Sequence, residues 1–202
     1  PLTPTEKWPI KELGTISTFE NGDRSSNYPS GDEIVESGIP FLSTKNIVDD
    51  KLDLSVLNFI SAEKFASLSR GKARPQDLII TLRGTLGSCC IFECEAQTAF
   101  INAQMMIIRP GPTVLPSFLH AFITLPQVKA HLNWIGNGAA VSQLTANQLS
   151  KLTVPVPPLD AQRAFASRVA EIKKLKSNHR GHLAKLDSLF ASLQYRAFRG
   201  EL

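Results

Sequence analysis

The chain has 202 residues, of which 43% are hydrophobic, and a formal net charge of +4. This size and composition predict one globular domain, alone or with an appendage. The sequence shows no charged and then apolar secretion signal, and its three cysteines are an odd number. Together these features exclude a disulfide scaffold and predict a protein of the reducing cytoplasm. The first residue, Pro1, indicates a processed or excised piece.

An uncharged run from 111 to 128 is long enough to raise the question of a membrane helix. It contains Pro112, Pro116, Pro126 and His120, so a spanning helix is not expected there.

The positive charge is concentrated at the C-terminal end. Residues 159–202 carry nine lysines and arginines against four acids, a net charge of +5, which leaves about −1 for residues 1–158. Within 64–83, basic residues face only Asp77. A basic patch of this kind suits a polyanion, although a solvated loop has the same composition.

The first 150 residues are typical of short mixed elements. Ser61 and Thr145, the latter in the capping-box segment TANQ, are expected to begin helices. Strands are expected at 39–42, 57–60, 77–82, 88–92 and 104–108, helices at 61–68, 117–125, 127–135 and after 145, a turn at 84–87 and a flexible loop at 136–138. The pattern predicts a mixed α/β domain with irregular loops.

The character of the chain changes at VPVPP, residues 154–158. Prolines at this density favour an extended backbone, and Asp160 is expected to cap a helix that runs without further proline to the C-terminus. Eight of ten heptad positions in this helix are apolar, which predicts a coiled-coil seam with a weak centre at Lys176 and His179. The seam is assigned to Phe165, Val169, Ile172, Leu183, Leu186, Phe190 and Leu193. Such a helix needs a partner, and its weak centre is either a polar register point or a kink.

The segment RGTLGSCCIFEC, residues 83–94, has several readings, among them a phosphate loop, a metal site, a thiol nucleophile and a nucleic-acid contact. The spacing of its cysteines does not fit zinc, and buried structural cysteine is the common case. If 88–92 is a strand, Cys89 and Cys90 point to opposite faces. Its two glycines lack the third glycine and following helix of a dinucleotide fingerprint.

No catalytic centre is indicated elsewhere. Gly71-Lys72-Ala73 lacks the hydroxyl residue and the earlier glycine of a P-loop. Asp77 is followed by Glu93-Cys94-Glu95, which lacks the lysine of a nuclease with paired carboxylates, and the Asn/Asp-Pro-Pro-aromatic segment of amino-methyltransferases is missing. The four histidines form no HExxH arrangement.

Taken together, several segments resemble the specificity (S) subunits of type I restriction-modification systems. They are WPIKELGTI (8–16), DLIITLRGTLG (77–87), TAFINAQMMIIRP (98–110), VPVPPLDAQRAFASRVAEI (154–172) and LDSLFASLQYRAFRGEL (186–202). The last two are the most specific, and the resemblance spans nearly the whole chain.

The resemblance implies a non-catalytic subunit that recognises a two-part double-stranded DNA sequence. Methyltransferase (modification) subunits would transfer methyl groups from S-adenosylmethionine, and restriction subunits would join to cleave DNA. S-adenosylmethionine, ATP and Mg²⁺ are expected on these partner subunits, so this chain itself would bind no cofactor. Members of the family usually have two target recognition domains, each followed by a long helix, whereas this chain has one of each. It is therefore expected to be half of a longer subunit or a half-subunit that pairs with its own copy.

On this hypothesis residues 1–154 read DNA, and 155–202 form a long helix that pairs with a second helix, acts as a spacer and assembles the subunits. The length of this helix would set the spacing between the two half-targets. Arginine holds guanine bidentately, and asparagine or glutamine holds adenine, so loop residues of these types are candidates for base reading, with basic residues for phosphates. The candidates are Ser43, Thr44, Lys45, Asn46, Arg70, Lys72, Arg74, Arg83, Thr85, Asn137, Ser142 and Gln143, the last three in the loop 137–143. Two other hypotheses remain at this point: a stand-alone DNA-binding regulator and an enzyme with an unrecognised site.

Overall fold

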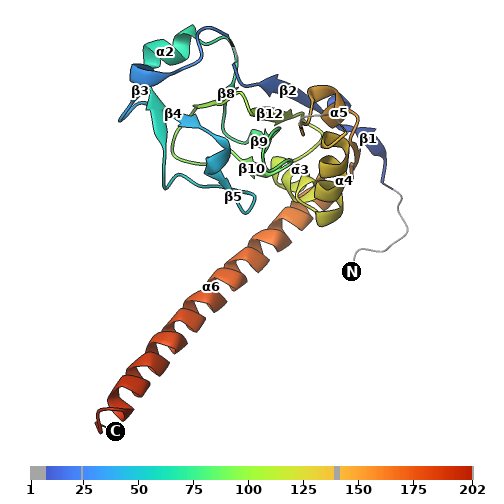
Figure 1. Cartoon of the computed structure of the whole chain (residues 1–202). Helices are drawn as coiled ribbons and strands as arrows, with labels where there is room; N and C mark the ends of the chain where they lie inside the picture. The colour runs from blue at the N-terminus through green and yellow to red at the C-terminus, as the bar shows by residue number, and fades with distance from the viewer. Residues whose placement is uncertain (1–7, 24, 139–141, 202) are drawn as a thin grey trace. The chain divides into compact units, whose positions relative to one another are not determined.

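The computed structural model describes residues 8–23, 25–138 and 142–201. The chain forms two compact units, which meet in sequence between Gln162 and Arg163 (Figure 1). The first is a mixed α/β domain and the second is the greater part of a long C-terminal helix. Among the described residues, no helix combines the length and the apolar character needed to cross a membrane.

The helices of the first unit are short. They are α1 (Leu13–Ile16), α2 (Ala62–Ser67), α3 (Pro116–Ile123), α4 (Pro126–Gly136) and α5 (Ala146–Ser150), with 3-10 turns η1 (Gly31–Glu33) and η2 (Thr44–Asn46). The strands are β1 (Ile10–Glu12), β2 (Ser17–Asn21), β3 (Ile34–Val35), β4 (Ile39–Leu42), β5 (Ile47–Val48), β6 (Lys51–Leu52), β7 (Asn58–Ile60), β8 (Lys72–Ala73), β9 (Leu78–Thr81), β10 (Cys89–Ile91), β11 (Ala99–Ile101), β12 (Met105–Pro110) and β13 (Thr153–Pro155).

An antiparallel sheet of order β10-β9-β12-β2 lies at the centre of the domain (Figure 1). Alternate side chains point to opposite faces of a strand. Accordingly Ile80 and Met106, paired across β9 and β12, join a buried cluster that includes Leu119 of α3 and Leu132 of α4. Ile79 and its neighbours face a second cluster. The sheet therefore carries helices on one face and further strands on the other.

Those further strands belong to a five-stranded sheet of order β3-β7-β4-β11-β8. Only the pairing of β11 with β4 is parallel in it. Phe41 and Phe100, neighbours across this parallel pair, pack at 5.1 Å between ring centroids, and Tyr28 closes over both. This aromatic group fixes the edge of the domain near α2, whose Phe65 packs against the same cluster.

Helix starts follow the caps expected from the sequence. The Ser61 side chain accepts a hydrogen bond from the Lys64 backbone N–H at 3.1 Å, and Thr145 forms the expected capping box with Gln148. Pro116 and Pro126 begin α3 and α4, because proline has no N–H to lose in the first turn of a helix.

The loop expected to begin at Gly136 begins later, so that prediction was wrong by one residue. Gly136 ends α4, where a Cβ atom would lie 2.7 Å from Leu86 Cδ1 and 3.3 Å from Leu144 Cδ2. Glycine is required at this position because the helix end and the β9–β10 turn approach each other closely.

The proline-rich segment is extended, as expected. Its strand β13 pairs with β1, and Val156 N donates to Pro9 O at 2.8 Å. The helix that follows, α6, begins at Leu159, so Asp160 lies inside the first turn and is not its cap. The prediction of Asp160 as the cap was wrong because the helical conformation starts directly after the last proline.

Gln162 explains why the first compact unit extends beyond 154 to the start of α6. Its side chain is fully buried, donates to the carbonyls of Thr113 (3.0 Å) and Pro157 (2.8 Å), and accepts from Leu115 N at 2.8 Å. These bonds tie the first turn of α6 to the domain. The predicted division of labour between 1–154 and 155–202 stays a prediction.

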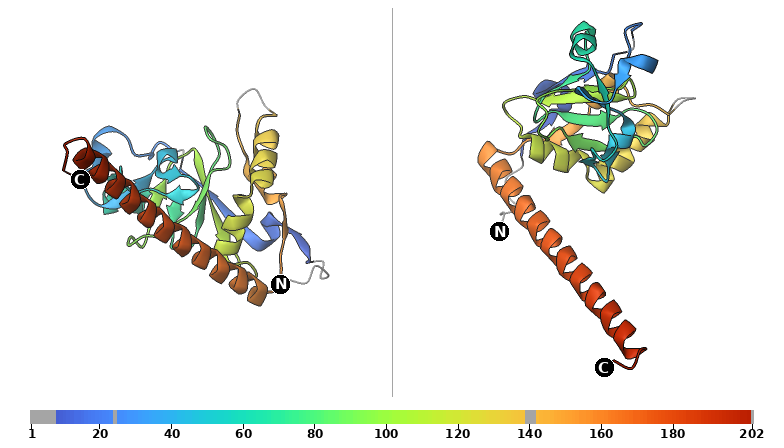
Figure 2. Two further views of the ribbon diagram at one scale, coloured as in Figure 1. Left: turned by 90° about the horizontal axis from the view of Figure 1, so that it is seen from below. Right: turned by 90° about the vertical axis from the view of Figure 1, so that its left-hand side faces the viewer.

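Helix α6 runs from Leu159 to Ala197 as one continuous helix, drawn in two further directions in Figure 2. At about 1.5 Å per residue its 39 residues span about 58 Å. The weak centre between Lys176 and Gly181 is helical throughout, and the polar register point and the kink both stay predictions.

Candidate nucleic-acid interface

The turn between β9 and β10 is closed by a threonine. Thr81 Oγ1 donates to the backbone carbonyl of Thr85 and accepts from Ser88 N at 3.1 Å. Gly84 and Gly87 both have φ of 74°, which only glycine adopts readily. The turn thus has a defined shape, with the exposed side chain of Thr85 on its outside.

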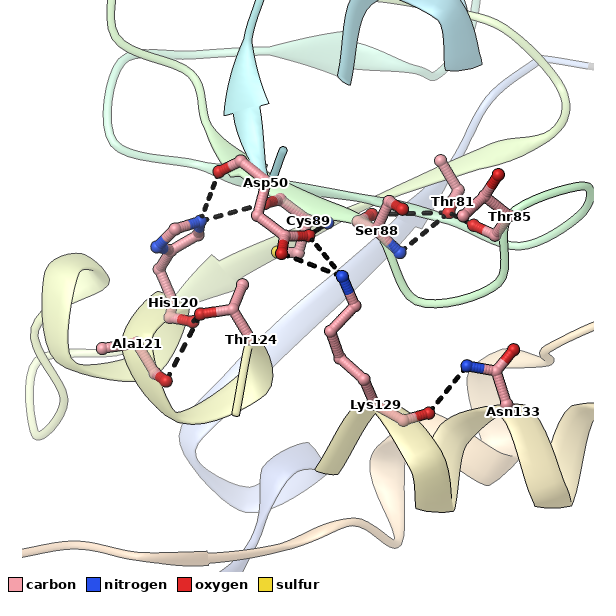
Figure 3. Close-up of polar contacts among 10 residues, drawn as sticks. All are labelled: Asp50, Thr81, Thr85, Ser88, Cys89, His120, Ala121, Thr124, Lys129 and Asn133. Atoms are coloured by element: carbon pink, nitrogen blue, oxygen red, sulfur yellow. Dashed lines mark hydrogen bonds and ion pairs between the residues drawn. The ribbon is translucent and has the colours of Figure 1, made fainter. Parts of the chain in front are cut away.

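A loop residue anchored by four contacts lies beside this turn (Figure 3). The Asp50 carboxylate binds Lys129 Nζ at 2.8 and 3.0 Å and accepts from Cys89 N at 3.1 Å. His120 Nε2 lies 3.0 Å from the Asp50 carbonyl and 2.9 Å from the Cys89 carbonyl. Because both neighbours are acceptors, this ring nitrogen must carry its proton. Asp50 is therefore held against β10, α3 and α4 at once.

A cavity of about 600 Å³ lies between this anchored loop and the β9–β10 turn. Three predicted candidates line it, Thr44, Lys45 and Thr85, together with Asp50 and Lys129. Lys45 is exposed. The sequence reasoning missed Lys129, because a lysine in the middle of a predicted helix gives no sign that it faces a loop far away in sequence.

Arg83 and Gln143, both predicted candidates, are joined directly. Arg83 Nε and Nη2 donate to Gln143 Oε1 at 2.9 and 2.6 Å. The next residue, Leu144, donates its N–H to Leu82 O at 2.9 Å, which lays the two segments side by side. Residues 139–141 of the predicted loop lie outside the described residues.

A second cavity, of about 320 Å³, adjoins Gln143. Arg70 lies on its wall and is exposed, and Asn21 at the end of β2 lines it as well. No carboxylate is among the residues that line it. The structure therefore brings Arg70 and Gln143 to one hollow, with Arg83 bound to Gln143.

Ser43 and Asn46 shape their own loop. Asn46 Oδ1 accepts from Ser43 N at 2.9 Å, and its Nδ2 donates to the carbonyls of Asp53 (3.0 Å) and Val56 (2.8 Å). Asn46 is 5% exposed. Since both ends of its amide are buried and occupied, we assign Asn46 to loop structure and do not carry forward its predicted base contact.

The remaining candidates are not brought into these two cavities. Lys72 is half-buried with its Nζ 4.8 Å from the Phe65 ring centroid, whereas Arg74, Asn137 and Ser142 are exposed. Exposed basic and polar side chains of this kind suit phosphate contacts, which need little fixed geometry.

Asp77, considered above as a nuclease carboxylate, is 2% exposed and bound to Arg109. The hydrogen bonds that Arg109 donates to the Asp77 carboxylate are the first cause that raises the pKa of the Arg109 guanidinium, and the charges of Asp77 and Glu20 raise it further against the effect of burial. Glu20 also accepts from the backbone N–H groups of Gly71 and Lys72 at 2.7 and 3.1 Å. These carboxylates hold the fold together.

Cys89 and Cys90 fill the core, as expected, whereas Cys94 is half-buried and packs against the second cluster. Cys89 faces the helix-side cluster and Cys90 the opposite one. Burial raises the pKa of the Cys90 thiol to about 12, with the Asp50 charge adding to it, and raises the pKa of Cys89 well above its usual value. Thiols held neutral are poor nucleophiles and metal ligands. The described residues include no group of three or more side chains suited to a metal ion.

Along α6 the predicted seam is largely exposed. Ile172, Leu183, Leu186 and Phe190 are each between 52% and 63% exposed. Two leucines outside the predicted seam, Leu175 and Leu189, are 57% and 56% exposed and lie one position before the heptad positions 176 and 190. They widen the apolar stripe beyond the two positions per heptad of a simple two-stranded seam.

These features, a loop-rich α/β domain and a helix with an exposed apolar stripe, agree with a known family. The Type I restriction modification DNA specificity domain matches residues 5–187. The chain belongs to this family. The resemblance found in the sequence is confirmed, and with it the mixed α/β domain followed by a long helix.

Curated relatives of this specificity domain carry matching names. The EcoBI specificity subunit of Escherichia coli, a type I restriction enzyme subunit, is 27% identical over 176 residues, covering 85% of this chain and 37% of the relative. The EcoKI specificity subunit of E. coli K12 is 23% identical, covering 98% and 46%. The putative MjaX specificity subunit of Methanocaldococcus jannaschii is 25% identical, covering 84% and 37%. The chain therefore spans less than half the length of these relatives.

Solved structures share the fold of this specificity domain. A chain from a type I restriction-modification system, studied for its assembly and conformational transition, matches with a TM-score of 0.70 at 22% identity, covering 100% of this chain and 48% of that one. The HsdS subunit from Thermoanaerobacter tengcongensis matches with a TM-score of 0.65 at 22% identity, covering 100% and 47%.

Proposed function

We propose that this chain reads one half of a two-part DNA target within a type I restriction-modification complex. The observation that carries the proposal is the gathering of Arg70, Arg83, Gln143, Lys45 and Thr85 around two hollows of one domain. These residues come from segments far apart in sequence, and their side chains are the types that bind phosphates and base edges.

Helix α6 is the proposed site of assembly. Its exposed stripe offers a seam for a second specificity half or a second copy of this chain, and the added Leu175 and Leu189 leave apolar surface for a further neighbour. A helix of about 58 Å would hold two readers at a fixed distance. Paired copies would be related by two-fold symmetry and would read an inverted repeat.

The chain acts without catalysis in this proposal. S-adenosylmethionine belongs to the modification subunits, and ATP and Mg²⁺ to the restriction subunits, which the specificity subunit recruits. The bound state of Asp77 and the neutral, buried state of Cys89 and Cys90 support this division. Membership of the specificity family does not favour the stand-alone regulator.

Binding-site selection tests the proposal. The full chain is mixed with random duplex DNA at a fixed salt concentration, alone and with the modification subunit of the same system. We expect one recurring half-target, repeated in inverted orientation at a fixed spacing when the assembly has two readers. Selection of a site by the chain alone, unchanged by the modification subunit and with no copurification of the two, would favour the regulator instead. Cleavage or methylation by the purified chain would favour an enzyme.

A further inference from the structure

The bonding of the Arg83–Gln143 pair limits which base it can read. Gln143 Oε1 accepts from both Nε and Nη2 of Arg83, at 2.9 and 2.6 Å. Two donors on one atom identify that atom as the oxygen of the amide, and they occupy both of its lone pairs. Gln143 is left with donors only, the two hydrogens of its Nε2.

Adenine recognition by glutamine needs the group that Arg83 occupies. Glutamine holds adenine by accepting from its N6 amino group and donating to N7. With Oε1 filled by Arg83, Gln143 cannot accept from N6 while the pair is intact. The sequence-based assignment of a glutamine to adenine therefore does not hold for this residue in this structure.

The donors that remain match guanine. Gln143 covers the Nε–Nη2 edge of Arg83, which leaves the Nη1–Nη2 edge with two parallel N–H groups. Guanine presents two adjacent acceptors, O6 and N7, in the major groove, whereas cytosine presents an amino donor and adenine only one acceptor beside an amino group. An edge of donors alone is complementary to guanine.

The pair is held in place by the backbone on both sides. Leu82 and Leu144, which directly adjoin Arg83 and Gln143, are 1% and 0% exposed and are joined by the N–H···O bond of 2.9 Å. Gln143 N also donates to Gly136 O at 2.9 Å. A side chain oriented before binding loses less entropy on contact and discriminates more sharply.

We propose that Arg83, oriented by Gln143, reads a guanine of the target, with Gln143 as its positioning residue. This inference rests on the proposed function, since it names a base for the same surface. Arg70, on the wall of the adjoining cavity, supplies positive charge for the neighbouring phosphates.

The test compares the base preferences of variants. The full chain with its modification subunit, and the variants Arg83→Ala, Arg83→Lys and Gln143→Ala, are taken through the same selection at one salt concentration. Lys151→Ala is the control, because Lys151 is an exposed cation of the same domain that lies outside the pair and outside the candidate set. A duplex is then made in which 7-deazaguanine, which lacks the N7 acceptor, replaces the guanine whose selection falls in Arg83→Ala.

Arg83→Ala should lower the preference for guanine at one position about tenfold or more and leave other positions unchanged. Arg83→Lys keeps the charge and should weaken the same preference, because an ammonium can reach guanine acceptors but has no planar fork for Gln143 to orient. Gln143→Ala should weaken it partly without turning it to another base. Wild type should bind the 7-deazaguanine duplex about tenfold more weakly than the guanine duplex. Arg83→Ala should bind the two duplexes with the same affinity.

Three results would overturn the inference. Arg83→Ala could lower a preference for adenine instead of guanine, it could lose affinity equally for all sequences, or it could leave the base preference unchanged at every position. An equal loss would mark Arg83 as a phosphate contact, and no change would leave the pair as a structural bridge. These results keep a selected target and so leave the proposed function standing. A wild-type assembly that selects no sequence would overturn both.

Discussion

One edge of the Arg109 guanidinium binds both oxygens of the Asp77 carboxylate, with Nε 2.9 Å from Oδ1 and Nη2 2.8 Å from Oδ2. The pair joins the end of strand β12 to the residue before β9, and Asp77 Oδ2 also accepts from Arg74 N at 2.8 Å. The carboxylate thereby closes the turn that leads into the central strand.

Loss of the Asp77 charge should destabilise the domain. We expect Asp77→Asn to lower the free energy of unfolding by about 2 to 3 kcal/mol, at or below the low end of the range for breaking a buried pair, because Arg109 is 30% exposed and regains some water. Denaturant titration measures the change. Glu33→Gln removes the exposed ion pair with Lys64 and should destabilise the domain less than Asp77→Asn does. Equal losses in the two variants would contradict this ranking.

Acid stability should depend on Asp23. Burial raises its pKa, but hydrogen bonds from Ser25 and Ser69 outweigh that effect and lower the pKa from 3.8 to about 2. A carboxyl group with a lowered folded-state pKa stabilises the fold above the unfolded value and loses that contribution as the pH falls through the folded one. Asp23→Asn should thus cost up to about 2 kcal/mol at neutral pH, with the difference from wild type shrinking between about pH 4 and pH 2. Unfolding curves at several pH values measure it, and a difference independent of pH would refute it.

Lys45 should act on DNA through phosphates. It is exposed and lines the cavity of about 600 Å³ beside the β9–β10 turn. We expect Lys45→Ala to weaken binding to all sequences alike and to reduce the slope of log K against log salt by about 0.9, the value for one phosphate contact. Lys151→Ala, an exposed lysine at the end of α5, is the control and should leave the slope unchanged. An altered base preference in Lys45→Ala would show direct reading instead.

The apolar stripe of α6 should drive self-association. Leu186→Lys places a charge on a seam residue that is 61% exposed, and we expect it to shift sedimentation towards the single chain. Ser177→Lys adds the same charge outside the seam and should not. If Leu186→Lys and Ser177→Lys sediment alike, the seam has another role.

Gly181→Ala, where a Cβ would meet nothing within 4 Å, should stabilise the helix by up to about 1 kcal/mol in thermal unfolding.

The length of α6 should set the spacing of the two half-targets. Deleting one heptad, residues 174–180, keeps the seam in register and shortens the helix by about 10 Å. The selected spacer should shorten by about three base pairs at about 3.4 Å each. Binding-site selection with the deleted chain measures the spacer, and recognition of the original spacing would disprove the ruler.

Local chemistry was enough to predict many elements of this fold. A compact run of β-forming residues followed by a glycine turn marked β9 and β10, caps marked the starts of α2 and α5, and prolines marked the extended segment before α6. The heptad pattern predicted a long helix that needs a partner, because an apolar stripe without cover is visible in sequence alone. The short strands β3, β5, β6 and β8 were missed, since a two-residue strand is defined by its pairing and leaves no periodic pattern.

The candidate site was likewise determined in part by the sequence and in part by the tertiary structure. The sequence by itself determined the family, the order of a mixed α/β domain and a long helix, and a set of loop residues with suitable chemistry. Only the tertiary structure decided which of them meet: it placed Lys129 against Asp50, buried Asn46 within its own loop and joined Arg83 to Gln143. Hydrogen bonds between segments tens of residues apart depend on how the sheets and helices pack. No local sequence pattern predicts that packing. Residue types therefore predicted which side chains could bind DNA, and the fold determined which of these side chains contact one another.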